Sequence, residues 1–409
     1  MAIDNKDKKV LKSSIEREQN EPACSAEREK IKGSKNLNVP HLRFPEFSGE
    51  WVTKSINDLA VVIGGGTPDT TVKSYWDGEI QWFTPSEIGK NKYVDSSLRT
   101  ITEVGLNNSS AKLLPPNTIL LSSRATIGEC SLSLRECATN QGFQCLVSKK
   151  CNVDFLYYLI QTKKKDLIRK SCGSTFLEIS ANEVRKIQVS VPSDVEQQKI
   201  AELLSLIDER IATQNKIIED LKKLKSAISL KMLHSDSWEQ FKIQDIASIG
   251  RGRVISSVEI SQQENPLYPV YSSQTSNDGI MGYLDDFMFE GEYISWTTDG
   301  ANAGTVFYRN GKFNCTNVCG LLKLKKGFDA HFVSLVLAEA TRMYVSTNLA
   351  NPKLMNNTMG NIQIRLPKLE EQKRISVVFR KLHGLLETHN SLIIKYSKQK
   401  QYLLSQMFI

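Results

Sequence analysis

The sequence predicts an α+β protein with an internal repeat, in which each of two globular halves is followed by a long α-helix. Two observations support this prediction. The motif P-x-x-x-E-Q-x-[KR]-I occurs at residues 192–200 and again at residues 367–375, a shift of 175 residues. An apolar pattern typical of a long helix follows each copy. A chain of 409 residues has room for two to three domains, and the repeat favours two.

Each globular half begins at a tryptophan. Trp51 precedes I-N-D-L-A at residues 56–60, and Trp238 precedes the similar I-Q-D-I-A at residues 243–247. The chain before the first half has no aromatic residue up to position 40 and carries many charges of both signs. The predicted order is a mobile charged tail (residues 1–39), a globular domain (40–192), a central helix (193–235), a second globular domain (236–366) and a C-terminal helix (367–409).

Weaker similarities continue inside the halves. Residues 126–128 (T-I-G) resemble residues 302–304 (N-A-G), and residues 138–140 (A-T-N) align with residues 315–317 (C-T-N). The sequences between these points differ. Similar ends and dissimilar middles predict one scaffold that presents two different surfaces.

The apolar residues of both long helices alternate three and four positions apart, as in a coiled-coil seam. The predicted seam residues are Leu204, Ile207, Ile211, Ile218 and Leu221 in the first helix and Phe379, Leu382, Leu386, Ile393 and Tyr396 in the second. Gln214 and His389 occupy matching polar positions near the middle, where a polar pair would specify the register. A single amphipathic helix usually covers a globular core, but two copies in register favour helices that pack along their whole length.

Composition excludes several classes of protein. The net charge of +8 and the pI of about 8.9 suit an anionic partner, although many proteins without one share this excess. The cysteines form no C-x-x-C pair and the histidines no H-E-x-x-H motif, which predicts neither a metal site nor a disulfide framework. No signal-peptide core and no apolar run of about 18 residues occurs. We therefore expect a cytoplasmic protein that does not enter a membrane.

Three matches to enzyme motifs are incomplete. Residues 265–268 (N-P-L-Y) lack one proline of the N-P-P-Y loop of amino-methyltransferases, and Asp69 stands where a dinucleotide loop has its third glycine. Residues 68–81 resemble the P-D…E-x-K pattern of nucleases, but Gln81 replaces the lysine. No P-loop sequence occurs. We predict no catalytic residue and no cofactor in this chain. A fused DNA methyltransferase and nuclease, or a coiled-coil scaffold, stay as alternatives.

Polar, glycine-bearing turns of both halves suit DNA, because bases are read by Arg, Lys, Asn, Gln, Ser or Thr and phosphates by cations or free amides. The candidate DNA-binding residues are Gly65, Thr67, Tyr75, Ser86, Arg124, Ser174 and Thr175 in the first half and Arg251, Arg253, Gln274, Thr298 and Lys353 in the second. Each turn alone is more simply explained as a solvated loop. Their matching places in a repeat favour DNA.

The ordered set of motifs resembles the specificity subunits of type I restriction-modification systems. The markers are F-P-E-F-S-G-E-W at residues 44–51, G-S-T-F at residues 173–176 followed by I-Q-V-S-V-P at residues 187–192, and the twice-occurring P-x-x-x-E-Q-x-[KR]-I. The resemblance covers residues 40–409. Residues 348–352 (N-L-A-N-P) depart from the corresponding G-S-T-F.

The resemblance implies two target recognition domains, each of which reads one half of a split site in double-stranded DNA. It also implies that the two long helices pack as an antiparallel coiled coil between these domains. Methyltransferase subunits, two of them expected, would supply the S-adenosylmethionine chemistry. Restriction subunits would supply ATP- and Mg2+-dependent translocation and cutting.

Overall fold

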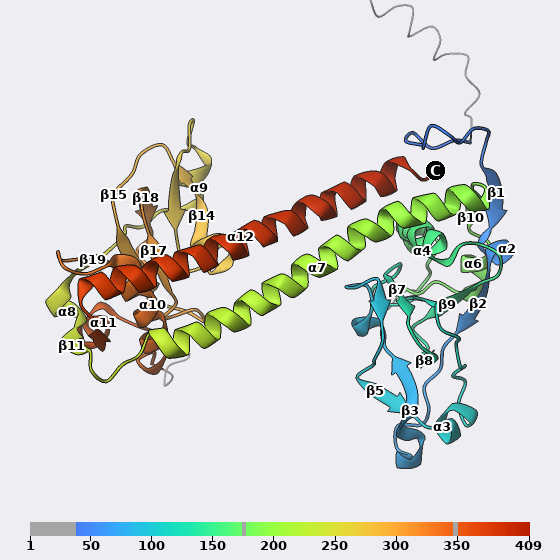
Figure 1. Ribbon diagram of the computed structural model, residues 1–409, viewed down its shortest axis with the longest axis horizontal. Coiled ribbons are helices and arrows are strands. Elements are labelled where there is room, and N and C mark those ends of the chain that lie inside the picture. Colours follow the sequence, from blue (N-terminus) through green and yellow to red (C-terminus); the bar gives the residue numbers. More distant parts are fainter. Residues whose placement is uncertain (1–37, 174–176, 347–350) are drawn as a thin grey trace, which may run out of the picture. The chain divides into compact units, whose positions relative to one another are not determined.

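The computed structural model describes residues 38–173, 177–346 and 351–409. The chain forms two compact units. Unit 1 contains residues 38–212 and 395–409, and unit 2 contains residues 213–394. Two long helices, α7 (Asp194–Met232) and α12 (Leu369–Gln406), contribute residues to both units (Figure 1).

The described residues of unit 1 form three sheets. The strands of its two larger sheets are, in spatial order, β2 (Ala60–Gly64), β9 (Gln144–Ser148), β6 (Ile119–Leu121), β7 (Cys130–Ser133) and β4 (Tyr93–Val94), and then β5 (Arg99–Ile101), β3 (Trp76–Phe83) and β8 (Cys137–Thr139). A separate antiparallel pair joins β1 (Val52–Ser55) to β10 (Gln188–Val191). This pair brings the beginning and the end of the domain together.

Short helices connect these strands. They are α2 (Ile56–Leu59), η1 (Lys73–Tyr75), η2 (Pro85–Glu87), α3 (Glu103–Asn107), α4 (Val153–Thr162), α5 (Lys164–Arg169) and α6 (Ala181–Arg185). Helix α4 begins where the Asn152 side chain accepts a hydrogen bond from the Phe155 amide. Its residues 155–160 are all buried. A helix that is apolar on every side must be covered on every side, and α4 shares one core with the sheet and the start of α7 (Figure 1).

Unit 2 repeats this plan. Its two larger sheets contain β12 (Ala247–Arg251), β19 (Cys319–Leu324), β16 (Tyr293–Thr297) and β17 (Val306–Arg309), and then β14 (Ile280–Leu284), β13 (Tyr268–Tyr271), β18 (Lys312–Cys315) and β15 (Phe289–Glu290). The small antiparallel pair is β11 (Glu239–Lys242) with β20 (Gln363–Leu366). The helices are α8 (Ile243–Ile246), α9 (Ser257–Ser261), η3 (Ser276–Gly279), α10 (Ala330–Ala340), η4 (Thr341–Met343) and α11 (Asn356–Asn361).

The repeated glutamine of the P-x-x-x-E-Q motif closes each unit. The Gln197 Nε2 donates to the Pro192 carbonyl at 3.0 Å, and its Oε1 accepts from the Asn152 amide at 3.1 Å. Gln372 makes the same two bonds, to the Pro367 carbonyl at 2.9 Å and from the Asp329 amide at 2.9 Å. Both glutamines are buried. The motif therefore ties the start of each long helix to the cap of the buried helix beneath it.

The seam residues of the long helices face each other. In unit 1, Leu403 of α12 and Met407, which directly follows α12, share a core with Leu204 and Ile207 of α7. In unit 2, Leu233, which directly follows α7, shares a core with Phe379. Ile218 and Leu382 are buried, whereas Ile211, Leu221, Leu386, Ile393 and Tyr396 are half-buried. The start of one helix thus packs beside the end of the other, and the predicted antiparallel arrangement is confirmed.

The polar seam positions are paired. His389 Nδ1 lies 2.6 Å from Gln214 Oε1 within unit 2, and both side chains are half-buried. Lys400 donates to Asp208 at 2.7 Å within unit 1, and the Tyr158 hydroxyl donates to the other oxygen of the same carboxylate at 2.7 Å. Polar groups inside a seam specify one register because any shift leaves them unpaired.

Candidate nucleic-acid interface

Most of the predicted loops of unit 1 form backbone hydrogen bonds with the end of β8 and with residues 140–142, which follow it. The Gly66 amide donates to the Thr139 carbonyl at 2.8 Å, and the Asn140 amide donates to the Phe83 carbonyl at 3.1 Å. The Ser123 amide donates to the Gly142 carbonyl at 2.8 Å. The loops after β2, β3 and β6 therefore converge on one connection. We call residues 64–68, 83–87, 122–128 and 140–142 loop cluster 1.

Gly65 and Thr67 of this cluster have different roles. A Cβ at Gly65 would lie 2.0 Å from the Asn140 carbonyl oxygen, so the residue permits a close backbone approach. Thr67 is half-buried, and its hydroxyl donates to the Gln141 side chain. Gln141 itself is exposed. The sequence did not single out Gln141, although it lies next to a weak repeat signal at residues 138–140.

Arg124 projects from the turn after β6 and pairs with Glu178 at 2.9 Å. The two side chains keep 43% and 35% of their surface exposed, so a ligand can reach both. Arg124 and Glu178 also form a backbone bridge, as do Cys172 and Glu178. Ser174 and Thr175 lie between these positions, outside the described residues.

The two remaining candidates of unit 1, Ser86 and Tyr75, lie in different surroundings. Ser86 is exposed in η2 within loop cluster 1, where its Oγ lies 3.0 Å from Thr84 Oγ1. Tyr75 lies in η1 and packs against the cluster of Trp76, Trp82 and Ile101 on the smaller sheet. The structure therefore gives Tyr75 a packing role on the smaller sheet.

Unit 2 builds an equivalent cluster around residues 316–318, after β18. The Arg253 amide donates to the Cys315 carbonyl at 3.1 Å, the Thr316 amide to the Tyr271 carbonyl at 2.9 Å, and the Thr298 amide to the Val318 carbonyl at 3.0 Å. These bonds match those of unit 1 one by one. We call residues 251–253, 271–279, 297–304 and 316–318 loop cluster 2. The bonds equate Cys315 with Thr139, so the sequence alignment of A-T-N with C-T-N is wrong by one residue.

The same bonds equate residues 64–66 (Gly-Gly-Gly) with residues 251–253 (Arg-Gly-Arg). A Cβ at Gly252 would lie 1.9 Å from the Cys315 carbonyl oxygen, as close as at Gly65. The flanking positions carry Arg251, whose Nε donates to Asn356 Oδ1 at 2.9 Å, and Arg253, whose Nη1 donates to Glu259 at 3.0 Å. Hydrogen bonds from Arg253 lower the pKa of the Glu259 carboxyl. The middle glycine is therefore required in both units, whereas Gly66 is required in unit 1 alone, where a Cβ would lie 2.4 Å from the Ala111 amide nitrogen.

Thr298 is fully buried, and its hydroxyl donates to the Asp299 carboxylate at 2.7 Å. This burial argues against the predicted DNA contact, because no surface of Thr298 is accessible to a ligand. The neighbouring Asp299 keeps 26% of its side-chain surface exposed and pairs with Lys353 at 3.7 Å. Lys353 retains 41% exposure. Thr298 therefore positions Asp299.

Gln274 lies in the loop between β13 and η3, and its Nε2 donates to the Ile280 carbonyl. Asn277 and Asp278, in the adjoining η3, have positive φ angles of 49° and 53°. The buried Arg309 anchors this segment. It is 2% exposed and donates to Asp278 at 2.7 Å and to Ser295 at 3.0 Å. Arg309 was not predicted, because its partners are distant along the chain.

The ion pairs of the two clusters have opposite polarity. The Ile179 amide donates to the Ser123 carbonyl at 3.1 Å, and the Leu354 amide donates to the Thr298 carbonyl at 2.9 Å. These bonds place Arg124 and Asp299 at equivalent positions, and Glu178 and Lys353 likewise. Unit 1 therefore has a cation on the turn and an acid on the opposite loop, whereas unit 2 has the reverse.

Other chemistry is limited in the part of the chain that the structure describes. No group of three or more His, Cys, Asp or Glu side chains there could hold a metal ion. Burial raises the pKa of the Cys130, Cys137, Cys145 and Cys151 thiols to about 12, so these thiols stay protonated at neutral pH. Within the same residues, no helix is long and apolar enough to cross a membrane.

Comparison with known proteins identifies the family. A family model described as the type I restriction modification DNA specificity domain matches residues 48–223 and again residues 235–395. The chain therefore belongs to this family and carries its domain twice.

Individual relatives agree with this family. The type I restriction enzyme MjaIX specificity subunit of Methanocaldococcus jannaschii is 39% identical over 180 residues, 43% of this chain and 42% of that protein. The putative type I specificity subunit S.MpnORF365P of Mycoplasma pneumoniae is 35% identical over 246 residues, 56% of this chain and 89% of that protein. This chain thus spans less than half of the first of these two proteins.

The fold has also been seen in a solved structure. The crystal structure of a type I restriction-modification S subunit from M. genitalium superposes with a TM-score of 0.65 at 17% identity. The superposition covers 91% of this chain and 99% of that chain.

Proposed function

We propose that this chain is the sequence-specificity subunit of a type I restriction-modification complex, and that each loop cluster binds one half of a split site in double-stranded DNA. One observation carries the proposal most directly. Within a chain of the specificity family, two clusters are built with matching backbone hydrogen bonds but present different side chains. A scaffold that repeats while its projecting groups change is suited to two different half-sites.

The exposed groups of each cluster have the chemistry of base and phosphate contacts. In unit 1 they include Arg124 and Gln141, and in unit 2 the exposed Arg253, the half-buried Arg251 and, beside the cluster, Lys353. Arginine and lysine donate to guanine or phosphate, and glutamine forms paired bonds with adenine. Acidic partners such as Glu178 and Asp299 hold these cations in place and accept from cytosine.

The paired long helices would set the separation of the two half-sites. Adding one heptad to both α7 and α12 preserves the seam and should lengthen the unread spacer in the preferred DNA site. Mapping of methylated sites on random DNA measures this spacer. A heptad added to α7 alone is the control, because it breaks the pairing of Gln214 with His389. An unchanged spacer in a folded double insertion would contradict the proposed role of the helices.

We expect the chemistry to lie on partner subunits. Two methyltransferase subunits would bring S-adenosylmethionine, and restriction subunits would bring ATP and Mg2+, in a complex that acts in the cytoplasm. This expectation has its support in the incomplete enzyme motifs of the sequence. The isolated chain should then bind no S-adenosylmethionine in calorimetry, whereas a fused methyltransferase would bind it.

Selection of bound sequences from random duplex DNA tests the proposal. The chain, assembled with its methyltransferase subunits, should enrich a split motif with an unread spacer. Its affinity should fall steeply with salt because phosphate contacts release counterions. A coiled-coil scaffold without DNA specificity would enrich no motif, and that result would overturn the proposal.

A further inference from the structure

In unit 1, residues 42–49, which precede β1, cover the start of α7. Arg43 of this segment forms a two-pronged pair with Glu196, with Nε to Oε1 at 2.7 Å and Nη2 to Oε2 at 2.8 Å. The Trp51 indole donates to the same carboxylate at 3.3 Å. Glu196 is consequently only 1% exposed. The carboxylate and the indole together form a receptor for a guanidinium group.

The same segment makes a second contact one helical turn further along α7. Glu46 pairs with Lys199, and the Lys199 ammonium lies 5.0 Å from the centre of the Phe44 ring and 6.0 Å from that of Phe47. Such cation–π contacts add to the ion pair. The segment is therefore recognised through an arginine, an acid three residues later and two aromatic rings.

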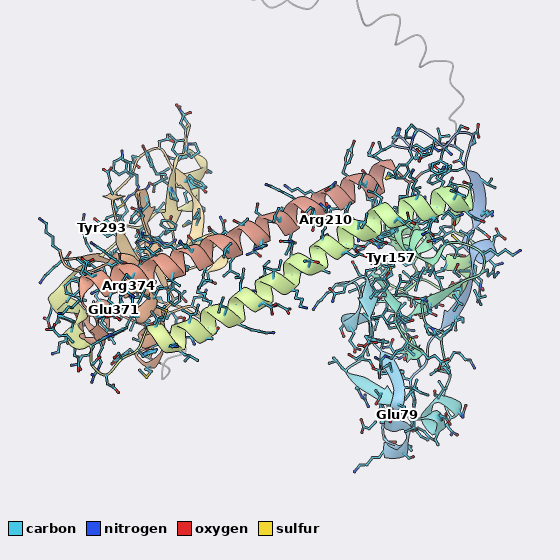
Figure 2. All side chains as sticks on the ribbon, in the orientation of Figure 1. Glu79, Tyr157, Arg210, Tyr293, Glu371 and Arg374 are labelled. Carbon is cyan, nitrogen blue, oxygen red and sulfur yellow. The ribbon has the colours of Figure 1, made fainter. Side chains whose placement is uncertain are left out.

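Unit 2 contains the corresponding residues, but no described segment equivalent to residues 42–49 covers them. A shift of 175 residues places Glu371 and Arg374 where unit 1 has Glu196 and Lys199. Figure 2 labels both on the first turns of α12. They are exposed, and among the described residues neither side chain has a hydrogen-bond or ion-pair partner. Trp238, the counterpart of Trp51, is half-buried, and its indole N–H has no acceptor among these residues.

A pocket of 790 Å³ occupies this place, lined by residues that include Trp238, Pro367, Glu371 and Arg374. The corresponding pocket of unit 1, which Arg43 and Phe47 help to line, has 320 Å³. The chain itself explains the difference. Only residues 233–238 connect α7 to β11, which is too short a link to repeat the path of residues 42–49.

We propose that this pocket of unit 2 binds an extended segment of a partner polypeptide, in which an arginine is followed three residues later by an acid and aromatic side chains adjoin them. The arginine pairs with the Glu371 carboxylate, which can also accept from the Trp238 indole as Glu196 accepts from Trp51. The acid pairs with Arg374, and the rings lie against the Arg374 guanidinium. The lining also carries Glu239, Lys231 and Lys368, so it suits a segment with charges of both signs.

The contacts in unit 1 favour a partner polypeptide over the chain's own segments as the occupant of this pocket. Residues 1–36 contain arginines but no aromatic residue, so they lack the rings. A second copy would have to release its own residues 42–49, which would leave the buried Glu196 unpaired. Breaking one such pair to form an equivalent one yields no net free energy. A different protein incurs no such cost.

A synthetic peptide of residues 40–50 (P-H-L-R-F-P-E-F-S-G-E), labelled with fluorescein, is the probe. Fluorescence anisotropy with the full chain should show saturable binding. The Glu371→Gln and Arg374→Gln variants should each weaken it by about tenfold or more, the loss expected for one charge-assisted pair. Both residues are exposed, so the variants should fold, and unit 1 is unchanged in each.

A matched charge exchange distinguishes specific from general attraction. A peptide in which the arginine and the glutamate are exchanged should bind the Glu371→Arg/Arg374→Glu double variant better than the unmodified chain. The proposal is overturned if the first peptide does not bind or if its binding is insensitive to Glu371→Gln. It is also overturned if the unmodified chain forms a dimer that Glu371→Gln dissociates, because the occupant would then be a second copy. The inference does not depend on which bases the loop clusters read.

Discussion

The two units share a frame and differ in what that frame presents. Gln197 and Gln372 make the same two hydrogen bonds, and Gly65 and Gly252 permit the same close approach. At the loop tips the side chains change, while the matched backbone bonds of Gly66 and Arg253, Asn140 and Thr316, and Ser123 and Thr298 are kept. Arginines replace glycines, and one exposed ion pair is reversed in polarity. Residues that hold the backbone are therefore repeated, and residues that face a ligand are free to differ.

A second difference between the units is whether a chain segment covers the start of the long helix. Glu196 is buried under residues 42–49, whereas its counterpart Glu371 is exposed. The Glu196→Ala variant should lose about 3 kcal/mol of stability, because Arg43 and the Trp51 indole lose their shared acceptor. Glu371→Ala should stay within about 0.5 kcal/mol of the unmodified chain. Urea denaturation compares them. Equal losses would show that the two starts of the long helices are energetically alike.

The central glycines should behave alike in both units. Gly65→Ala and Gly252→Ala each place a methyl group about 2 Å from a carbonyl oxygen, and overpacking of this kind costs about 1–3 kcal/mol. Gly250→Ala is the matched control, since a Cβ there meets nothing within 4 Å. Chemical denaturation again provides the measurement. A large effect in one unit only would contradict the equivalence of the loop clusters.

The centre of the seam tests how the helices are held in register. Replacing both Gln214 and His389 by leucine should raise the thermal stability by about 1 kcal/mol, because apolar pairs often replace polar seam pairs at a gain. It should also permit other registers, visible as several conformations of the helices in hydrogen exchange. A sharp fall in the melting temperature would indicate that the pair contributes more than register.

The smallest expected effect is a difference between the two units in how their stability depends on pH. Burial, followed by the nearby Arg380, lowers the pKa of His331 to about 4, against about 6.5 in an unfolded chain. Between these values the unfolded state binds more protons, so acidification through this range destabilises the fold. Asp154 is the unit 1 counterpart of His331, and it pairs there with Lys92.

His331→Gln should therefore reduce the loss of stability between pH 7 and pH 5. Since His331 is only half-buried, we expect a change below about 1 kcal/mol. Urea denaturation at the two pH values measures it. An unchanged pH dependence would show that His331 titrates normally.

The sequence predicted the frame better than the interface. The α+β repeat and the two long helices followed from repeated motifs and apolar spacing, which are visible along the chain, whereas the antiparallel packing was implied by the family resemblance. The contacts of Gln141, Arg309 and Glu178 were not predictable, because each depends on loops that meet only in the folded unit. The sequence predicted that Thr298 contacts DNA, but Thr298 directly follows the paired strand β16 and its side chain is buried. Burial of a single polar residue in a turn has no periodic signal.

The central claim is that each loop cluster reads one half of the DNA site. Exchanging charges within one ion pair tests it while keeping the pair: Arg124→Glu with Glu178→Arg in unit 1, and Asp299→Lys with Lys353→Asp in unit 2. Methylated sites are mapped across the genome of cells that carry each variant with the methyltransferase subunits. We predict that each exchange alters one half of the split site and leaves the other half and the spacer unchanged. Changes in both halves from a single exchange, or no change from either, would contradict the account.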